Sequence, residues 1–348
     1  MTVLTHSSLE GAQHGGSKTL LELAEFAKKS GAAGFQPSNY HFLKKDGSLM
    51  SLSEVRHILN QVEIRLDGIS AHCWFWAMQT AWTHSKTIRP FIPKELWEES
   101  PEKIAQYCED KIVELLDLAA GLGLKVMPMF WGVAYGWEVA TGYPWGFWAN
   151  KDAEYDFIAE GDERFINSSE RVRREANARN IFLAHEIHPG TAASCADDFN
   201  HLVKICDGDK TLTVNADPSH NWEGESWLER IRKVGDRIAG CHVKNHVIIP
   251  NMALRCMAPD WKNRPMQFCN LRDGQIDMVA YVQEIFRCGY VQRYCEMHNT
   301  KTAPLVVEAE SAYDELDYTS ADGIAYVNEN LCRPAATGSF EDGMGEAA

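Results

Sequence analysis

Residues 181–188 read Ile-Phe-Leu-Ala-His-Glu-Ile-His, and residues 211–217 read Thr-Leu-Thr-Val-Asn-Ala-Asp. Each is a short, mainly apolar run that ends in polar residues, which is typical of a buried strand. Residues 196–206, between the two runs, have the apolar spacing of an amphipathic helix. A strand, a helix and a second strand of these lengths predict a parallel crossover unit.

The same rhythm extends in both directions along the chain. Further strands are predicted over residues 3–6, 32–36, 66–72, 125–131, 238–244 and 291–298, and further helices over 17–29, 53–63, 101–120, 163–177, 227–234, 277–287 and 321–331. Eight strands that alternate with eight helices predict an α/β fold, a (β/α)8 TIM barrel, as one domain over residues 1–333. An open doubly wound sheet shares this local pattern and stays the alternative. The acidic segment 334–348 is expected to be a flexible tail.

Charge and composition exclude several classes of function. Lys and Arg number 34 against 49 Asp and Glu, so the net charge of −15 argues against nucleic acid or an anionic membrane as partner and favours a small neutral ligand such as a sugar. No apolar stretch is long enough to span a bilayer, and the first residues do not resemble a signal peptide. The ten cysteines form no Cys-x-x-Cys pair and are expected to be free thiols. We therefore expect a cytoplasmic protein.

Metal-ligand side chains stand near the ends of the last four predicted strands. They are Glu186, Asp217, His242 and Glu296. Because successive barrel strands lie side by side, residues at their carboxyl ends can converge on one point. Three carboxylates and one imidazole suit Mn²⁺ or Mg²⁺, and Co²⁺ or Zn²⁺ are further candidates.

The last position of this set has two alternatives. Glu308 and Glu310 follow the apolar run 304–307 and would replace Glu296 if that run were the eighth strand. We rank them lower because Cys-Gly-Tyr at 288–290 predicts a helix end directly before residue 291.

Four long connections follow predicted strands, at residues 72–101, 131–162, 245–277 and 299–321, on the face where barrels build active sites. The first two are rich in tryptophan, so Trp131 and Trp145 are candidates for stacking on a sugar or an attached ring, with packing inside the loops as the alternative. His72 ends one predicted strand and His298 is in phase with Glu296, so both are candidates for substrate contact.

Four strings carry a family resemblance: His-Glu-Ile-His-Pro-Gly (185–190), Asp-Pro-Ser-His-Asn-Trp (217–222), Cys-His-Val-Lys-Asn (241–245) and Gly-Tyr-Val-Gln-Arg-Tyr-Cys-Glu (289–296). They resemble the site motifs of the xylose-isomerase-like TIM barrels, the sugar phosphate isomerase/epimerase family, over about residues 1–332. The resemblance implies that the four metal-ligand residues bind a divalent ion, with His188 and His220 as inner-site partners. Asn245 departs from the pattern, in which Asp often follows the Lys, and so does the long segment after Glu296.

Within that family, the aromatic segment 136–148 looks most like the catalytic α subunits of bacterial C-glycoside deglycosidases and related 3-keto-glycoside lyases. This resemblance implies a 3-oxo sugar glycoside as substrate and a divalent metal, commonly Mn²⁺. It also implies a smaller β subunit as partner, and hence a hetero-oligomer.

The residues suggest a mechanism for such an enzyme. His188 lies two residues beyond Glu186 on the same strand face, so it is the candidate general base for the C2 proton. Lys244 is a candidate donor to a substrate oxygen or the developing enolate, with a salt bridge at the barrel mouth as the alternative. His220 is a candidate for holding a substrate hydroxyl or orienting a ligand, with helix capping or loop packing as the alternative. Expulsion of the C1 substituent from the enolate makes a carbon-oxygen or carbon-carbon lyase. Reprotonation makes an isomerase or epimerase, which is the main alternative.

Two further alternatives belong to other classes. An abasic-site endonuclease would share the barrel and its metal, but the acidic net charge and the lack of a basic stripe count against it. A noncatalytic sugar-binding protein would use the acidic cluster for structure alone.

Overall fold

The computed structural model describes residues 4–133, 157–221, 224–250 and 265–332. Eight strands form one sheet in the order β3-β2-β1-β10-β7-β6-β5-β4, and all neighbouring pairs are parallel. Ala71, beyond β3, donates its N–H to Pro128 O of β4 at 2.8 Å, which joins the two ends of this order into a barrel. The strands are β1 (Leu4–Glu10), β2 (Gly34–Gln36), β3 (Arg65–Leu66), β4 (Val126–Met129), β5 (Phe182–Glu186), β6 (Leu212–Ala216), β7 (Ile238–Val243) and β10 (Thr302–Val307).

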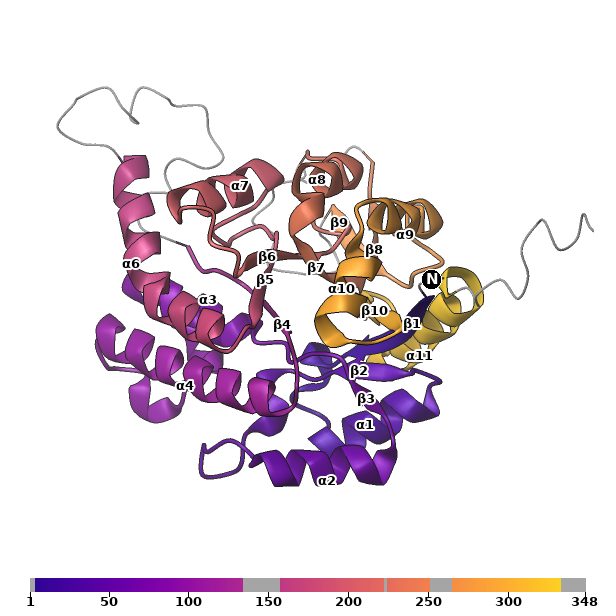
Figure 1. Cartoon of the computed structure of the whole chain (residues 1–348), viewed down its shortest axis with the longest axis horizontal. Coiled ribbons are helices and arrows are strands. Elements are labelled where there is room, and N and C mark those ends of the chain that lie inside the picture. The colour runs from indigo at the N-terminus through magenta and orange to yellow at the C-terminus, as the bar shows by residue number, and fades with distance from the viewer. Residues whose placement is uncertain (1–3, 134–156, 222–223, 251–264, 333–348) are drawn as a thin grey trace, which may run out of the picture.

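Helices surround the sheet (Figure 1). They are α1 (Leu20–Lys29), α2 (Leu52–Val62), α3 (His72–Thr80), α4 (Pro101–Gly121), α6 (Phe157–Ala178), α7 (Ala196–Ile205), α8 (Trp227–Val234), α9 (Met278–Arg287), α10 (Tyr290–His298) and α11 (Leu316–Tyr326). Side chains of Ser51, Ser100, Ser226 and Asp277 accept backbone N–H groups at the starts of α2, α4, α8 and α9. Among the helices of the described ranges, none has both the length and the apolar character that a bilayer crossing requires.

The hydrophobic core fills the layer between the strands and the helices. Strands β2, β4, β6 and β7 are buried at every residue, as expected for parallel strands that are covered on both faces. Large buried side chains such as Phe35, Phe75 and Phe199 contribute to one continuous cluster. Because this layer fixes the strands, it also fixes the positions of the side chains at their carboxyl ends.

The predicted (β/α)8 barrel is confirmed, and seven of the predicted strands overlap strands of the sheet. The strand predicted over 291–298 is wrong, because these residues lie in helix α10. Tyr290, Val291 and Tyr294 are buried at helical spacing, and Gly289 has φ of 77°, which separates α10 from α9. The eighth strand is the later run Thr302–Val307, where Pro304 lacks the N–H that a strand normally offers.

Two of the long connections contain regular structure. Helix α3 opens the connection after β3, and an antiparallel hairpin of β8 (Asn245–Ile248) and β9 (Met266–Cys269) follows β7. Buried Asn245 fastens this connection: its Nδ2 donates to Leu271 O and Ile276 O, and its Oδ1 accepts from Ile276 N and His246 N. An aspartate has no N–H to donate to those carbonyls, so these hydrogen bonds explain why residue 245 is asparagine and not aspartate.

Candidate active site

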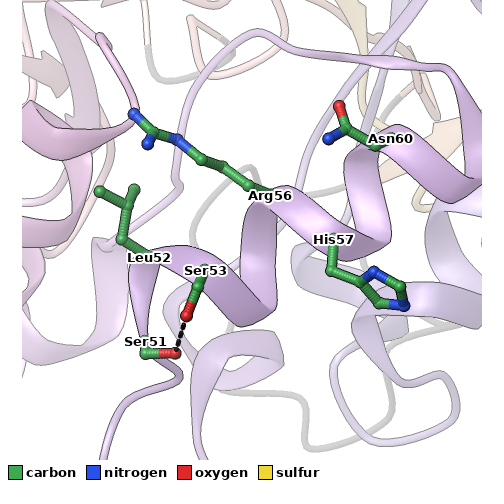
Figure 2. A pocket seen from close by; sticks show the side chains of 6 residues that line it. All are labelled: Ser51, Leu52, Ser53, Arg56, His57 and Asn60. Atoms are coloured by element: carbon green, nitrogen blue, oxygen red, sulfur yellow. Dashed lines mark hydrogen bonds between the residues drawn. The ribbon is translucent and has the colours of Figure 1, made fainter.

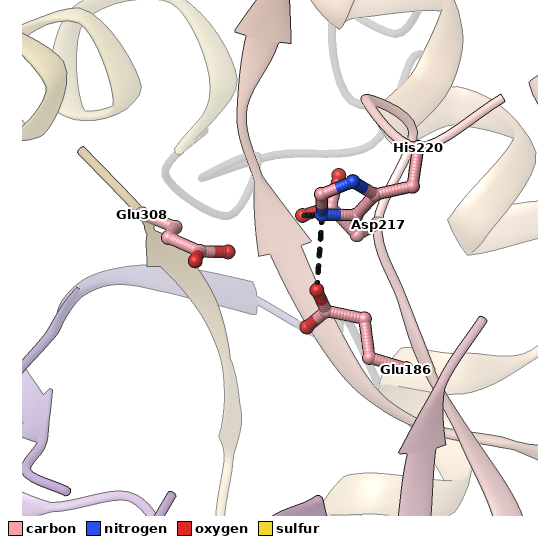
Figure 3. Close-up of side chains that lie close together, drawn as sticks. All are labelled: Glu186, Asp217, His220 and Glu308. Atoms are coloured by element: carbon pink, nitrogen blue, oxygen red, sulfur yellow. Dashed lines mark ion pairs between the residues drawn. The ribbon is translucent and has the colours of Figure 1, made fainter. Parts of the chain in front are cut away.

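Four metal-ligand side chains converge at the carboxyl ends of the strands. Glu186 ends β5, Asp217 follows β6, His220 lies three residues further, and Glu308 follows β10. One ligand atom from each of the four lies within 4.8 Å of the others. Figure 3 shows the carboxylate of Glu308 facing Glu186 and Asp217, with the His220 ring next to them. The barrel therefore gathers three carboxylates and an imidazole in one place.

A second imidazole, His242 of β7, contacts all three carboxylates. Its Nδ1 lies 2.9 Å from Glu308 Oε2, 3.1 Å from Glu186 Oε2 and 4.0 Å from Asp217 Oδ2. His220 Nε2 lies 3.1 Å from Glu186 Oε1 and 3.5 Å from Asp217 Oδ2. Two histidines therefore contact the carboxylates of this cluster, and either could be the imidazole that completes the donor set.

Neighbouring donors fix the direction of the carboxylates. Asn215 Nδ2 donates to Glu186 Oε2 at 3.0 Å. Asn215 can sit there because residue 240 is glycine: a Cβ on Gly240 would lie 2.4 Å from Asn215 Oδ1. Gln13 Nε2 donates to Glu308 Oε1 at 2.7 Å. The other oxygen of Glu308, Oε2, faces His242. The groups are therefore held in place before any ligand arrives.

Burial and crowding shift the pKa values of these groups in opposite directions. Desolvation and the nearby charge of Glu186 raise the pKa of Asp217 to about 7. Desolvation also opposes the ionisation of Glu186, yet the charge of His242 and contacts with His220 hold the pKa of Glu186 well below its usual value. The pKa of His242 is well above its usual value because the carboxylates outweigh its burial. The centre concentrates negative charge that a cation would relieve.

The donor set fits a divalent cation. Asp217 Oδ1 accepts the N–H of Ser219 at 2.6 Å, but buried Oδ2 accepts no hydrogen bond from the described residues and has only the imidazoles of His220 and His242 near it, at 3.5 and 4.0 Å. A buried carboxylate oxygen without a donor is costly unless it meets a cation or a proton. Three carboxylates with imidazole nitrogen match the preference of Mg²⁺ and Mn²⁺ for oxygen-rich sites.

Three other predicted residues lie beside this cluster. The His188 ring is 4.1 Å from the His220 ring, and burial lowers the pKa of His188. Lys244 is buried, with Nζ 3.2 Å from Glu308 Oε1 and 2.5 Å from Glu310 Oε2. His72, the first residue of α3, has Nε2 3.5 Å from Glu186 Oε2.

Two of the predicted site residues, Glu296 and His298, lie away from the cluster. Glu296 is exposed on α10, where it accepts from Gln292, and Glu308 takes its expected place because the eighth strand is the later run. His298 accepts from the N–H of Lys125, just before β4, and is therefore at the opposite end of the barrel.

Trp131 does not reach the cluster either. Its ring is fully buried against Phe75 and Phe165, at centroid distances of 5.3 and 5.4 Å, so it is a core residue between α3 and α6. Trp145 lies outside the described residues.

Sequence reasoning missed the contributions of the first two strands. Glu10 ends β1 and Gln36 ends β2, and Gln36 Nε2 lies 3.1 Å from His242 Nε2. The predicted first strand stopped at residue 6, so Glu10 was not recognised as a strand-end residue. The signal that could have found both is their position at the carboxyl ends of consecutive strands.

A separate hollow of about 600 Å³ lies on the outer helix α2. Figure 2 shows its lining: Ser51, Leu52, Ser53, Arg56, His57 and Asn60. This lining contains no carboxylate, and Arg56 is engaged with Gly121 O at 2.9 Å. The acidic cluster of the barrel is therefore the better candidate for metal-assisted chemistry.

The Xylose isomerase-like TIM barrel family model matches residues 24–320. The chain belongs to the xylose isomerase-like TIM barrel family. A search of the curated proteins finds no significant match. Members of this fold are also found among solved structures, at low sequence identity.

Three of these structures cover nearly the whole chain. The probable 3-DHS dehydratase of Bacillus anthracis is 14% identical, with a TM-score of 0.60 and 93% of this chain and 99% of that chain covered. A xylose isomerase-like TIM barrel protein of Mycobacterium smegmatis in complex with magnesium is 14% identical, with a TM-score of 0.57 and coverage of 94% and 96%. The 3-keto-D-glucoside 4-epimerase of E. coli is 12% identical, with a TM-score of 0.56 and coverage of 93% and 99%. At these identities the likeness supports the fold of the xylose isomerase-like family.

Proposed function

We propose that the chain is a divalent-metal-dependent lyase that acts on a 3-oxo-glycoside, removing the C2 proton and eliminating the C1 aglycone. The observation that carries this proposal is the buried group of Glu186, Asp217 and Glu308 with two imidazoles, next to the histidine His188. A hard cation site beside a base of this kind suits proton removal from a carbon next to a carbonyl. The smaller partner subunit remains a prediction from the resemblance of residues 136–148.

The three carboxylates and one imidazole would hold the cation, for which we propose Mn²⁺. We assign the imidazole to His242, because its Nδ1 faces all three carboxylates and the carboxylate of Glu10, 3.5 Å from Nε2, is the kind of acceptor that the second nitrogen of a metal-bound histidine usually has. His220 is then left to contact a substrate hydroxyl. When bound, the cation supplies Lewis-acid polarisation of the substrate carbonyl and stabilises the adjacent negative charge.

His188 has the protonation state that a general base needs. Its Nδ1 lies 2.6 Å from Pro189 O, and because a carbonyl only accepts, Nδ1 must carry the hydrogen. Burial lowers the pKa of His188 and keeps the ring neutral near pH 7. The lone pair is therefore on Nε2, where it can take the C2 proton.

Lys244 supplies positive charge where the enolate develops. Its ammonium is buried between Glu308 and Glu310 and lies 4.0 Å from the ring centroid of Phe268. Burial lowers the pKa of Lys244, but the two carboxylates outweigh this effect and raise it above its usual value, so the group stays charged. A fixed cation of this kind favours the charged enolate over the neutral substrate.

The elimination balances without a further reagent. His188 takes the C2 proton, and the electrons of the C2–H bond pass through the enolate to form the C1–C2 double bond. The bond between C1 and the aglycone breaks, and the aglycone leaves with the electron pair of this bond and takes up a proton. The products are the free aglycone and a sugar enone.

An isomerase or epimerase is the second candidate. His72 Nε2 lies 3.5 Å from Glu186 Oε2, so a further imidazole besides His188 adjoins the cluster and could return a proton to the enolate. The E. coli structure with a similar fold is a 3-keto-D-glucoside 4-epimerase, which supports a 3-oxo sugar under either reading. Loss or retention of the aglycone separates the two reactions.

Product analysis in deuterium oxide tests this proposal. We expect Mn²⁺-loaded protein to release aglycone from a 3-oxo-C-glucoside or a 3-oxo-O-glucoside and to form the sugar enone, followed by NMR and liquid chromatography. An intact glycoside that carries deuterium at C2, or its epimer, would move the function to epimerase. Cleavage of an abasic DNA duplex with no reaction on either sugar would exclude both.

A further inference from the structure

Glu10 is a buried carboxylate next to the proposed metal site, but it is not in the group of mutually close ligands. It is the last residue of β1 and is 1% exposed. Its Oε1 accepts the N–H of Ala12 at 3.1 Å, and its Oε2 accepts from Gln36 Nε2 at 2.5 Å. Both oxygens therefore have a fixed direction, and Oε2 also lies 3.5 Å from His242 Nε2.

The two nitrogens of His242 face different partners. Nδ1 faces Glu308 and Glu186, at 2.9 and 3.1 Å, while Nε2 faces Gln36 and Glu10. A neutral imidazole carries one hydrogen, so Nδ1 can offer a lone pair to a cation only if the hydrogen is on Nε2. Gln36 Nε2 is itself a donor 3.1 Å from Nε2, so without a cation it can donate to a lone pair on Nε2 while Nδ1–H donates to Glu308. Once a cation takes the lone pair of Nδ1, the hydrogen must be on Nε2, and of the described side chains that face Nε2 only the carboxylate of Glu10 can accept it.

We propose that Glu10 is a positioning residue: it accepts the Nε2 hydrogen of His242 when a cation binds at Nδ1, and so favours the tautomer whose Nδ1 lone pair points toward the three carboxylates. Gln36 holds Glu10 in turn and keeps Oε2 on the side of His242. The first two strands thereby orient a ligand of the seventh. This inference rests on the proposed metal site.

Metal affinity tests the inference without any substrate. Mn²⁺ is titrated into the full-length metal-free protein by isothermal calorimetry, for wild type, Glu10→Gln, Glu308→Gln and the exposed-residue variant Glu25→Gln. Loss of a partner of a metal-bound histidine typically weakens metal binding by about 10–100-fold, and we expect Glu10→Gln to raise the dissociation constant by this factor. Glu25→Gln should bind as wild type, and Glu308→Gln should bind more weakly than Glu10→Gln. The Co²⁺ absorption spectrum of Glu10→Gln should also change, because the orientation of His242 differs.

The outcomes separate this inference from the proposed function. If wild type does not bind Mn²⁺, the proposed metal site is wrong. If wild type binds and Glu308→Gln is impaired while Glu10→Gln binds like Glu25→Gln, the positioning role is overturned and the metal site stands. If Glu10→Gln does not fold, Glu10→Asp is measured: it keeps the charge but withdraws the carboxylate, and unchanged affinity or a second failure to fold overturns the positioning role.

Discussion

Replacing Glu308 by glutamine should almost eliminate Mn²⁺ binding and with it the release of aglycone. The carboxylate of Glu308 faces Glu186 and Asp217, and its Oε2 lies 2.9 Å from His242 Nδ1. The amide keeps the size of the side chain but removes the negative charge that a divalent ion needs. Loss of a residue that only hydrogen-bonds to a metal ligand weakens metal binding by up to about 100-fold. Because Glu308 is itself a proposed ligand, we expect its loss to raise the dissociation constant for Mn²⁺ by more than this. Calorimetric titration and a turnover assay measure the two effects.

Glu296→Gln is the matched variant, because Glu296 stands in the motif that sequence reasoning assigned to the metal. It is exposed on α10 and accepts only from Gln292 among its described contacts. We expect this variant to bind Mn²⁺ and turn over as wild type does. Loss of metal in Glu296→Gln with retention in Glu308→Gln would refute the placement of the site after β10.

Replacing His188 by glutamine should lower kcat by about 10²–10⁴-fold, the usual contribution of a general base. The imidazole adjoins His220 at 4.1 Å between ring centroids, and its Nδ1 is held by Pro189 O, so Nε2 is the free base. Because His188 is not among the three carboxylates or the histidine assigned to the metal, Mn²⁺ affinity should stay within about twofold of wild type. Single-turnover kinetics and metal titration together measure this separation.

His57→Gln on the exposed surface of α2 is the comparison for this variant, and it should leave both quantities unchanged. If His188→Gln retains the wild-type rate with Mn²⁺ bound, then another group takes the C2 proton. Equal loss of metal and rate would instead make His188 a ligand.

Most of the barrel could be predicted because its strands are short apolar runs between amphipathic helices. Glu186, Asp217 and His242 follow from this pattern, since residues at the carboxyl ends of barrel strands can converge on one site. His220 lies beyond the end of β6 and followed from the family resemblance. The eighth strand could not be predicted in the same way. Helix α10 is an additional helix between α9 and β10, and its buried aromatic and β-branched residues also suit a strand.

The errors at the site have related physical causes. Glu296 and Glu308 each follow a segment that can be assigned to a strand, 291–295 by its β-branched and aromatic residues and 304–307 by its apolar run, and only the chain path decides which segment joins the sheet. Trp131 follows β4 as predicted, but its ring packs under α3, a helix that the sequence pattern did not indicate. Glu10 was missed because β1 is rich in polar residues and extends beyond the predicted strand.

Metal dependence of the elimination tests the central claim most directly. One preparation is assayed for aglycone release from a 3-oxo-glucoside as purified, after EDTA treatment, and after return of Mn²⁺, with bound metal measured by elemental analysis at each stage. We predict that release disappears with the metal and returns with one Mn²⁺ per chain. Release that continues at the full rate in protein shown to be free of metal would contradict the account.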